Sequence, residues 1–307
     1  MKIMNNKLSI TGTFLDEISH DIPSANWGID EWRKDFDAMK KIGIDTVILI
    51  RAGYKDKITF NSESLKKSFS IRPAYIDLVD LFLIEAGRCG MNFYFGLYDS
   101  GIFWINGDYR KEVELNYRLT EEVIKKYGHR KAFQGWYASH ELTVYDDNQL
   151  KMYQQLAEHL RGLKDVPILM SPYVKGNKQF GETISPKKHE EDWNTILSAL
   201  SGKVDIVAFQ DGQVEFSELS KFMEINKKLA DKYNLRSWSN VETLERGMPI
   251  DFFPIDWRNL IYKIEMAESV GVEKLITFEF SHFMSPNSMY PSAHNLYNRY
   301  KEWLDEN

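Results

Sequence analysis

Residues 204–233 of the chain read VDIVAFQDGQVEFSELSKFMEINKKLADKY. The first seven residues form a short apolar, β-branched run, which predicts a strand. Residues 217–233 form a longer run with apolar residues at helical spacing, which predicts an amphipathic helix. The strand does not alternate between apolar and polar residues, as is typical of a parallel strand buried on both faces. The stretch therefore predicts one strand–helix unit of a parallel α/β fold.

The same unit recurs from end to end of the chain. The predicted strands are residues 8–15, 46–51, 92–98, 133–139, 167–173, 204–210, 235–241 and 274–280. Helices are expected around residues 32–43, 73–90, 110–127, 148–163, 186–200, 217–233, 255–270 and 291–305. Eight such units predict an α/β protein with a single (β/α)8 TIM barrel, formed by residues 1–307 as one domain. A doubly wound sheet in two domains is the alternative, but no Pro/Gly/Ser-rich linker and no Gly-rich loop after the first strand support it.

Composition narrows the functional classes. The 307 residues are 43% hydrophobic and 27% charged, as in globular proteins. The net charge of −6 gives no basic field for nucleic acid, so we expect no nucleic-acid partner. The single Cys89 can form neither an intramolecular disulfide nor a zinc cluster, and we expect it in the core. His129, His159, His189 and His294 are expected at the surface, away from any site.

Targeting signals are also absent from the sequence pattern. Residues 1–7 are polar and contain no signal-peptide h-region, which predicts a cytoplasmic protein, or a periplasmic or secreted one if a leader preceded this sequence. No apolar run is long enough to cross a bilayer, so we expect no membrane partner. We expect no cofactor and no metal, and the oligomeric state is left open.

The carboxyl ends of the predicted strands carry polar and aromatic residues, and these ends form the active-site face of a TIM barrel. The candidate substrate-binding residues are Asp16, Glu17, His20, Arg51, Tyr98, Trp104, Trp136, His140, Tyr173, Gln210, Asp211, Trp238, Asn240, Glu279 and His282. Glu141 and Glu242 are further acidic residues at these ends. Carboxylates divide acid and base roles across a scissile bond, and aromatic rings pack on the C–H faces of sugars. This combination suits a carbohydrate substrate.

Glu141 closes the fourth predicted strand in GWYASHE, and Glu242 closes the seventh in LRSWSNVE. This order resembles the clan A glycoside hydrolases. The resemblance implies a retaining hydrolase of poly- or oligosaccharides, with Glu141 as acid/base, Glu242 as nucleophile and Arg51 as the group that keeps the nucleophile ionised. The segments GTFLDE, FGLYDSGIFW, GWYASHE and FQDG are similar to an uncharacterised bacterial family of glycosidase-like barrels, a domain of unknown function.

Three positions depart from the clan A pattern. His140 stands where the clan usually has Asn, Gln210 and Asp211 stand where it has His or Tyr, and Glu279 and Phe280 stand where it has Trp. These departures leave two alternatives to a retaining hydrolase. The first is a non-catalytic carbohydrate-binding barrel.

The other alternative is a metal-dependent barrel enzyme. Its expected ligands are Glu141, Asp211, Glu242, Glu279 and His282. Asp211 is also the rival acid for an inverting hydrolase, which needs carboxyls about 6.5 to 9.5 Å apart rather than the 5 to 5.5 Å or so of a retaining one.

Overall fold

Eight parallel strands close into a barrel in the order β1-β14-β11-β10-β9-β8-β6-β2. The structure is a computed structural model that describes residues 7–176, 183–246 and 252–306. The barrel strands are β1 (Ile10–Leu15), β2 (Thr46–Leu49), β6 (Asn92–Gly96), β8 (Phe133–Ala138), β9 (Ile168–Met170), β10 (Ile206–Gln210), β11 (Arg236–Asn240) and β14 (Lys274–Thr277). The predicted (β/α)8 TIM barrel is confirmed, and the doubly wound alternative is wrong because the sheet has no open edge.

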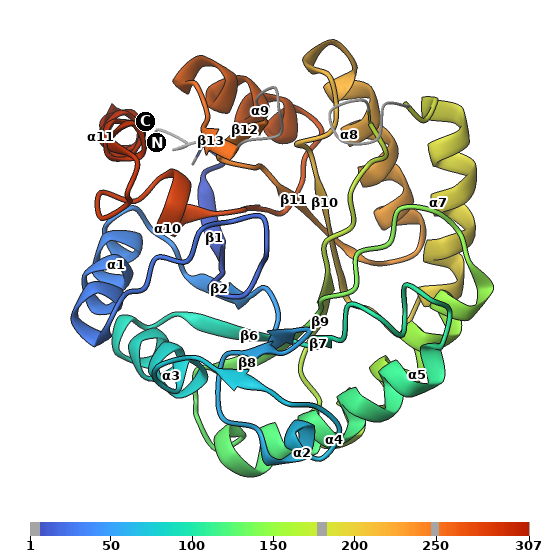
Figure 1. The fold of residues 1–307 in the computed structure, drawn as a ribbon. Coiled ribbons are helices and arrows are strands. Elements are labelled where there is room, and N and C mark those ends of the chain that lie inside the picture. Colours follow the sequence, from blue (N-terminus) through green and yellow to red (C-terminus); the bar gives the residue numbers. More distant parts are fainter. Residues whose placement is uncertain (1–6, 177–182, 247–251, 307) are drawn as a thin grey trace.

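A ring of helices surrounds the barrel (Figure 1). These are α1 (Ile29–Lys41), α3 (Leu78–Cys89), α4 (Tyr109–Tyr127), α5 (Asp147–Leu163), α7 (Pro186–Leu200), α8 (Phe216–Lys232), α9 (Trp257–Ser269) and α11 (Pro291–Glu306). The side chains of Asp77, Asp146 and Ser185 accept hydrogen bonds from backbone N–H groups in the first turns of α3, α5 and α7. Such caps satisfy backbone donors that would otherwise have no partner, and they fix where each helix starts.

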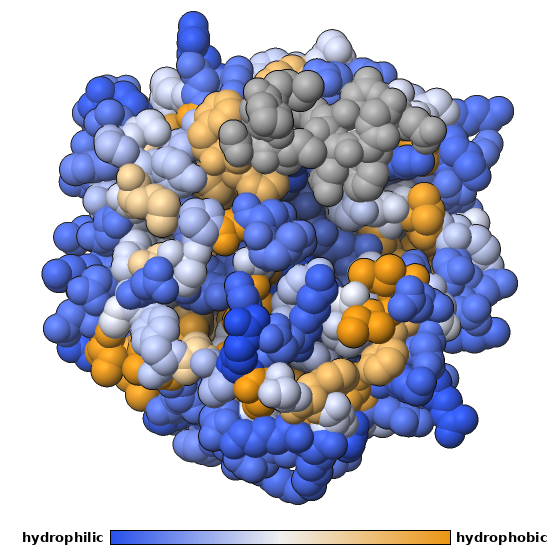
Figure 2. Space-filling model, viewed as in Figure 1, coloured by the Kyte–Doolittle hydropathy of each residue, from blue (hydrophilic) through white to orange (hydrophobic). Residues whose placement is uncertain are grey.

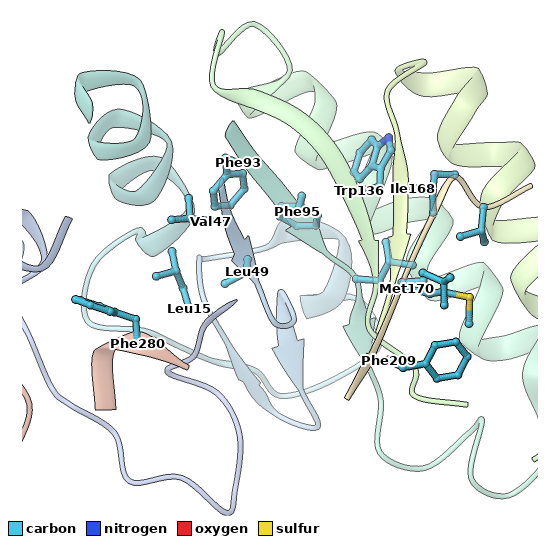
Figure 3. Packing of buried hydrophobic residues seen from close by; sticks show 14 of the residues in the cluster. Leu15, Val47, Leu49, Phe93, Phe95, Trp136, Ile168, Met170, Phe209 and Phe280 are labelled. Atoms are coloured by element: carbon cyan, nitrogen blue, oxygen red, sulfur yellow. The ribbon is translucent and has the colours of Figure 1, made fainter. Parts of the chain in front are cut away.

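The core has two layers because successive strand residues point to opposite faces. Inside the barrel lie Phe14, Ile48, Tyr94, Tyr137 and Trp238, with other apolar side chains. The larger layer fills the space between strands and helices, and Figure 3 shows part of it, including Phe93, Phe95, Trp136 and Ile168. Burial on both faces explains why the strand sequences read as continuous apolar runs.

Most barrel strands end earlier than the apolar runs suggested, although β1 and β10 end at the predicted residues. The third predicted strand divides into β6 and β7 (Tyr98–Asp99), because β7 leaves the barrel and joins β3 (Gly53–Tyr54), β4 (Lys57–Ile58) and β5 (Arg72–Pro73) in a separate small sheet. The eighth predicted strand ends at Thr277, and its last predicted residue starts α10 (Phe280–Phe283). A short helix, α2 (Glu63–Lys66), and a hairpin of β12 (Leu244–Arg246) and β13 (Phe252–Pro254) were not predicted. The hairpin follows the carboxyl end of β11, and α10 follows that of β14, whereas α2 packs against α4.

Three smaller expectations are settled by burial and helix composition. Cys89 is buried, as predicted. His189 is 1% exposed and bonds the Asn226 Oδ1 atom at 2.7 Å, so its predicted surface position is wrong. Its helix turns it toward Trp193, Phe209 and Phe222, a core contact that spacing alone did not reveal. In the described part of the chain, no helix is sufficiently long and apolar to cross a membrane.

Candidate active site

The residues that follow the barrel strands meet on one face, which we call the mouth. Figure 2 shows this face covered mainly by hydrophilic residues. Strands β10 and β11 pair in register from Ile206 and Arg236 to Gln210 and Asn240, so they end at the same level. Asp211 and Glu242 follow these ends directly and therefore lie together, and the Gln210 side chain reaches across to Glu141.

Glu141 follows β8 and is partly exposed in the mouth. Its Oε1 atom accepts a hydrogen bond of 3.1 Å from Gln210 Nε2. Burial raises the pKa of the Glu141 carboxyl; Arg51 and Gln210 oppose this effect, and the negative charge of Glu242 adds to it. Glu141 is thus a carboxyl group that tends to hold its proton, as a general acid must.

Glu242 lies in a different environment. Its carboxylate accepts hydrogen bonds from Arg246, with Oε2 at 2.7 Å from Nη1 and Oε1 at 3.5 Å from Nη2. Both side chains of this pair are nearly buried, which strengthens their attraction relative to a surface pair. The planar guanidinium matches the two carboxylate oxygens and so fixes the orientation of the Glu242 side chain. Arg246 is carried by β12, in the hairpin that the sequence did not reveal.

The backbone of Glu242 is held as firmly as its side chain. Asp211 Oδ1 accepts a hydrogen bond of 3.1 Å from the Glu242 N–H and one of 2.8 Å from Lys263 Nζ. Lys263, a buried residue of α9, also donates to the Glu242 carbonyl at 3.1 Å. Burial raises the pKa of Asp211, and Lys263 opposes this effect. Asp211 therefore orients Glu242 through its backbone.

Arg51 is placed near Glu141 and not beside Glu242. Its Nη1 atom lies 3.8 Å from Asp99 Oδ2, and its guanidinium lies 5.4 Å from the centre of the Tyr54 ring. Burial lowers its pKa, but the charges of Glu141, Asp99 and Asp16 outweigh this and raise it. The guanidinium paired with Glu242 is Arg246, so the prediction that Arg51 serves Glu242 is corrected. Sequence position could not reveal this, since Arg246 is not on a barrel strand.

The residues of the first loop also line this part of the mouth. The exposed His20 ring stacks on Tyr54, with ring centres 5.3 Å apart. Asp16 is buried and accepts hydrogen bonds from the N–H groups of Ile18 and Ser19, both at 2.9 Å. Glu17 accepts from the Ala25 N–H at 3.0 Å, and burial raises its pKa. Asp16 and Glu17 thus shape the loop, and His20 is the member of the three that solvent reaches most.

The predicted aromatic residues divide into two groups. Tyr173 is partly exposed beside Glu141, and burial together with the Glu141 charge raises its pKa to about 12. Trp104 is partly exposed, and its Nε1 donates to Asp99 Oδ1 at 2.9 Å. These two lie at the mouth.

The other three predicted aromatic residues do not line the mouth. Trp136 points outward from the barrel and donates to the Lys164 carbonyl, and Figure 3 shows it beside Ile168. Trp238 points inward but lies deep in the barrel, against Tyr94 and the side chains of Arg236 and Lys274. Tyr98 is buried, and its hydroxyl donates to the Lys55 carbonyl at 2.6 Å. Their predicted contacts with substrate are corrected. Whether a ring faces the mouth depends on which face of the strand carries it and on how far along the strand it lies, and composition shows neither.

Glu279 and Asn240 are buried structural groups. Glu279 accepts hydrogen bonds from the N–H groups of Ser281 and His282 and caps α10. Asn240 accepts from the Phe278 N–H at 3.0 Å and donates to Ser171 Oγ at 3.2 Å, which joins three barrel strands at their ends. The polar atoms of both side chains bond protein groups rather than facing the mouth. The predicted contacts of Glu279 and Asn240 with substrate are therefore corrected.

His282 is enclosed between two acceptors. Its Nδ1 bonds the Glu279 carboxylate, and its Nε2 bonds the Pro23 carbonyl at 2.7 Å. Only a protonated imidazole donates from both nitrogens. Burial lowers the pKa of His282, but Glu279 outweighs this effect and raises the pKa to about 9. His282 therefore ties α10 to the first loop as a cation, and its predicted contact with substrate is revised.

This ion pair predicts a pH dependence of stability. The stabilisation is complete below the unfolded-state pKa of about 6.5 and is lost as the pH rises through about 9. Between pH 6 and 10, the free energy of unfolding of the wild type should therefore fall by up to about 3 kcal/mol more than that of His282→Gln. Denaturant titrations at each pH measure the difference. His294→Gln, an exposed control, should follow the wild type, and parallel curves for wild type and His282→Gln would refute the charged pair.

One group of residues has metal-ligating potential. Among the described residues, only Asp99, Glu112 and His140 form a set of three His, Cys, Asp or Glu side chains whose ligand atoms lie within 4.8 Å of one another. The predicted metal ligands Glu141, Asp211, Glu242, Glu279 and His282 do not form such a group. In the observed set, His140 Nε2 already bonds Glu112 Oε1 at 2.9 Å, and Asp99 Oδ1 bonds Trp104 and the Gly101 N–H. These atoms already have protein partners, whereas Glu112 Oε2 and His140 Nδ1 have no hydrogen-bond partner among the described residues.

His140 is also not where the clan pattern implied. It is 1% exposed and faces α4, so its ring does not reach a substrate in the mouth. The sequence analysis missed three residues of this site: Arg246, Lys263 and Glu112. All three lie outside the barrel strands, where a search of strand ends does not look. The signal that could have revealed Lys263 and Glu112 is a charged residue on the apolar face of an amphipathic helix.

The chain belongs to a family described as a domain of unknown function, DUF4434, whose model matches residues 10–290. This confirms the family resemblance seen in the sequence. Curated protein sequences gave no match. A solved structure from Bacteroides thetaiotaomicron VPI-5482, provisionally described as an alpha-L-fucosidase, is 46% identical and superposes with a TM-score of 0.94. That similarity covers 98% of this chain and 94% of the other.

More distant solved structures share the fold. An endo-1,4-beta-D-mannanase from Thermotoga petrophila RKU-1 has a TM-score of 0.64 at 12% identity, covering 98% of this chain and 100% of the other. An endo-1,4-beta-mannanase from Rhizomucor miehei has a TM-score of 0.65 at 10% identity, covering 98% and 96%. The molecule is a glycosidase-like TIM barrel.

Proposed function

We propose that the protein is a retaining glycoside hydrolase of poly- or oligosaccharides, with Glu141 as general acid/base and Glu242 as nucleophile. The observation that carries this proposal is the contrast between two neighbouring glutamates. Burial favours the protonated form of Glu141, whereas the Glu242 carboxylate is held in an ion pair with Arg246, with Oε2 2.7 Å from Nη1. A carboxyl that tends to hold its proton and a second carboxylate near it are what this chemistry requires.

The reaction proceeds in two steps. Glu242 attacks the anomeric carbon while Glu141 gives its proton to the leaving glycosidic oxygen, which breaks the C–O bond and leaves a glycosyl ester on Glu242. Glu141, now a carboxylate, then takes a proton from water as that water attacks the anomeric carbon and releases Glu242. Oε1 of Glu242 is the oxygen less tightly held by Arg246, at 3.5 Å, and is the better placed to attack.

The sugar would be bound by groups around Glu141. Tyr173 and Trp104 offer aromatic surface, and His20 stacked on Tyr54 forms a further wall. Arg51 supplies hydrogen-bond donors to hydroxyl groups near the acid/base, and the side-chain oxygen of Gln210 is an acceptor, because both of its amide N–H groups already donate to Glu141 and to the Ser171 carbonyl. Loops on a fixed barrel set specificity, so residues 20–27 and 100–108 are the expected selectors of substrate.

A glycoside panel tests the proposal. The protein should hydrolyse at least one 4-nitrophenyl glycoside from a set that includes the α-L-fucoside, suggested by the Bacteroides relative, and the β-D-mannoside. Proton NMR of the first-formed sugar should show the anomeric configuration of the substrate. Inverted sugar would instead favour Asp211 as the second carboxylate. Saturable oligosaccharide binding without turnover would favour the non-catalytic barrel, an alternative supported by the fact that Arg246 already occupies Glu242.

Gly212 offers a steric test of the nucleophile's position. A Cβ atom on Gly212 would lie 1.6 Å from Glu242 Oε2 and 2.2 Å from Arg246 Nη1, so the ion pair lies directly over this glycine. Gly212→Ala should displace the Glu242 carboxylate and lower kcat/KM about 100-fold, since errors of about 1 Å in position have effects of that size. Steady-state kinetics on the best panel substrate measure this. Gly162→Ala, which meets no atom within 4 Å, is the control, and equal activity of both variants would contradict the assigned position.

A further inference from the structure

Glu112 is a fully buried carboxylate that belongs to no strand end and has no part in the two-step reaction. It lies in the first turn of α4, and its Oε1 accepts two hydrogen bonds: one of 3.0 Å from the Ser100 N–H and one of 2.9 Å from His140 Nε2. We infer that Glu112 is a positioning residue that couples the loop of residues 100–108 to the acid/base Glu141. This inference rests on the proposed function.

The orientation of Glu141 depends on the residue that precedes it. His140 directly precedes it and is held from three sides. Glu112 binds the imidazole, the Tyr153 hydroxyl of α5 donates to the His140 carbonyl, and the Trp104 ring packs edge-on against the imidazole with centres 5.5 Å apart. A residue fixed in this way leaves its neighbour little freedom of backbone orientation. The carboxyl of Glu141 is therefore aimed by contacts made one residue earlier.

Glu112 also fixes the start of the loop of residues 100–108. The Ser100 N–H that binds Glu112 opens residues 100–108, and the Ser100 hydroxyl in turn accepts from the N–H groups of Ile102 and Phe103 at 3.2 and 2.9 Å. One turn along α4, Asn116 binds both the N–H and the carbonyl of Tyr98 at 2.9 Å. Helix α4 thus holds the chain from Tyr98 to Ser100, which follows β6. Glu112 Oε1 links this part of the chain to His140.

The chemistry of Glu112 favours a positioning role over simple packing. A buried carboxylate is costly unless its hydrogen bonds compensate, and Glu112 Oε2 has no hydrogen-bond partner among the described residues. An apolar side chain would stabilise this helix face more. What the carboxylate provides is a directional acceptor shared by two segments that flank the mouth, and it fixes which imidazole nitrogen carries the proton.

Leaving-group dependence distinguishes positioning of the acid from a general structural role. An activated 2,4-dinitrophenyl glycoside departs without protonation, whereas an unactivated aryl glycoside needs the acid. Glu112→Leu, which leaves no side-chain acceptor for Ser100 and His140, should lower kcat/KM about 10- to 100-fold for the phenyl glycoside and less than about 3-fold for the 2,4-dinitrophenyl glycoside of the same sugar. Tyr153→Phe, which removes a different contact to His140, should show the same selectivity more weakly. Glu114→Leu, on the exposed side of α4, is the matched control and should change neither value.

Amide hydrogen exchange provides a readout independent of turnover. Glu112→Leu should accelerate exchange of the Ser100, Ile102 and Phe103 amides, and Glu114→Leu should not. Equal slowing of both glycosides, or unchanged loop exchange, would overturn the coupling while the proposed function stands. If the wild type hydrolyses no glycoside, the proposed function and the role of Glu112 toward a catalytic Glu141 both fall. The exchange data then decide only whether Glu112 links the two segments.

Discussion

Glu242→Gln should abolish turnover of every glycoside that the wild type accepts, with kcat falling about four orders of magnitude or more, as when a hydrolase loses its nucleophile. Glutamine is isosteric, but its amide cannot form the glycosyl ester. The Asp211 and Lys263 contacts to the backbone of residue 242 remain, so the fold should survive. Steady-state rates, measured beside circular dichroism and the midpoint of thermal unfolding, check both statements.

Glu245→Gln is the matched control for this variant. Glu245 lies three residues later on β12, and its carboxylate binds Asn259 rather than the mouth. It should retain wild-type turnover. Retention of activity by Glu242→Gln would remove Glu242 from the mechanism, and an equal loss in both variants would indicate that the hairpin region, rather than the carboxylate, matters.

Glu141→Ala should lower kcat/KM by about 10² to 10⁴ for glycosides with poor leaving groups, the range typical of a lost general acid. Activated 2,4-dinitrophenyl glycosides should be nearly unaffected in kcat/KM, because their leaving group needs no proton. The loss of activity at high pH should also disappear in the variant. The raised pKa of Glu141 keeps the acid protonated toward higher pH in the wild type, and its deprotonation produces that limb of the profile.

Azide provides the complementary test of Glu141→Ala. Without the carboxylate, a small anion can approach the glycosyl ester, so azide should restore turnover and yield a glycosyl azide of retained configuration. Gln210→Ala, which removes a hydrogen bond to Glu141 but keeps the carboxyl, should respond to azide little or not at all. A uniform loss of activity for all leaving groups in Glu141→Ala would contradict the acid role.

Most of the fold could be predicted because the barrel strands are buried on both faces. Runs such as residues 206–209 are apolar and buried along their whole length, and an amphipathic helix follows. The predicted ends were less accurate. The run at residues 92–98 stays apolar although β7 departs into the small sheet, since Leu97 and Tyr98 are buried there as well. Burial, which the sequence pattern reports, does not say which sheet a strand joins.

The site was predictable where it depends on strand order and was not where it depends on side-chain direction. Glu141 and Glu242 follow β8 and β11, and the register of the barrel brings them to the same mouth. Trp136 and Tyr137 are adjacent in sequence, yet one faces the helices and the other faces the barrel interior. Arg246 pairs with Glu242 through a hairpin whose pairing joins residues 244–246 to residues 252–254. No local pattern predicted that contact.

The central claim is that Glu242 forms a covalent bond to the sugar. Incubation with the 2-deoxy-2-fluoro, activated-leaving-group form of the accepted glycoside, followed by mass spectrometry of the digested protein, tests it directly. The account predicts a stable mass increase of one fluorosugar on the peptide that contains Glu242, and none in Glu242→Gln. A label on Asp211 or another residue, or turnover of the natural glycoside with no trapped ester, would contradict it.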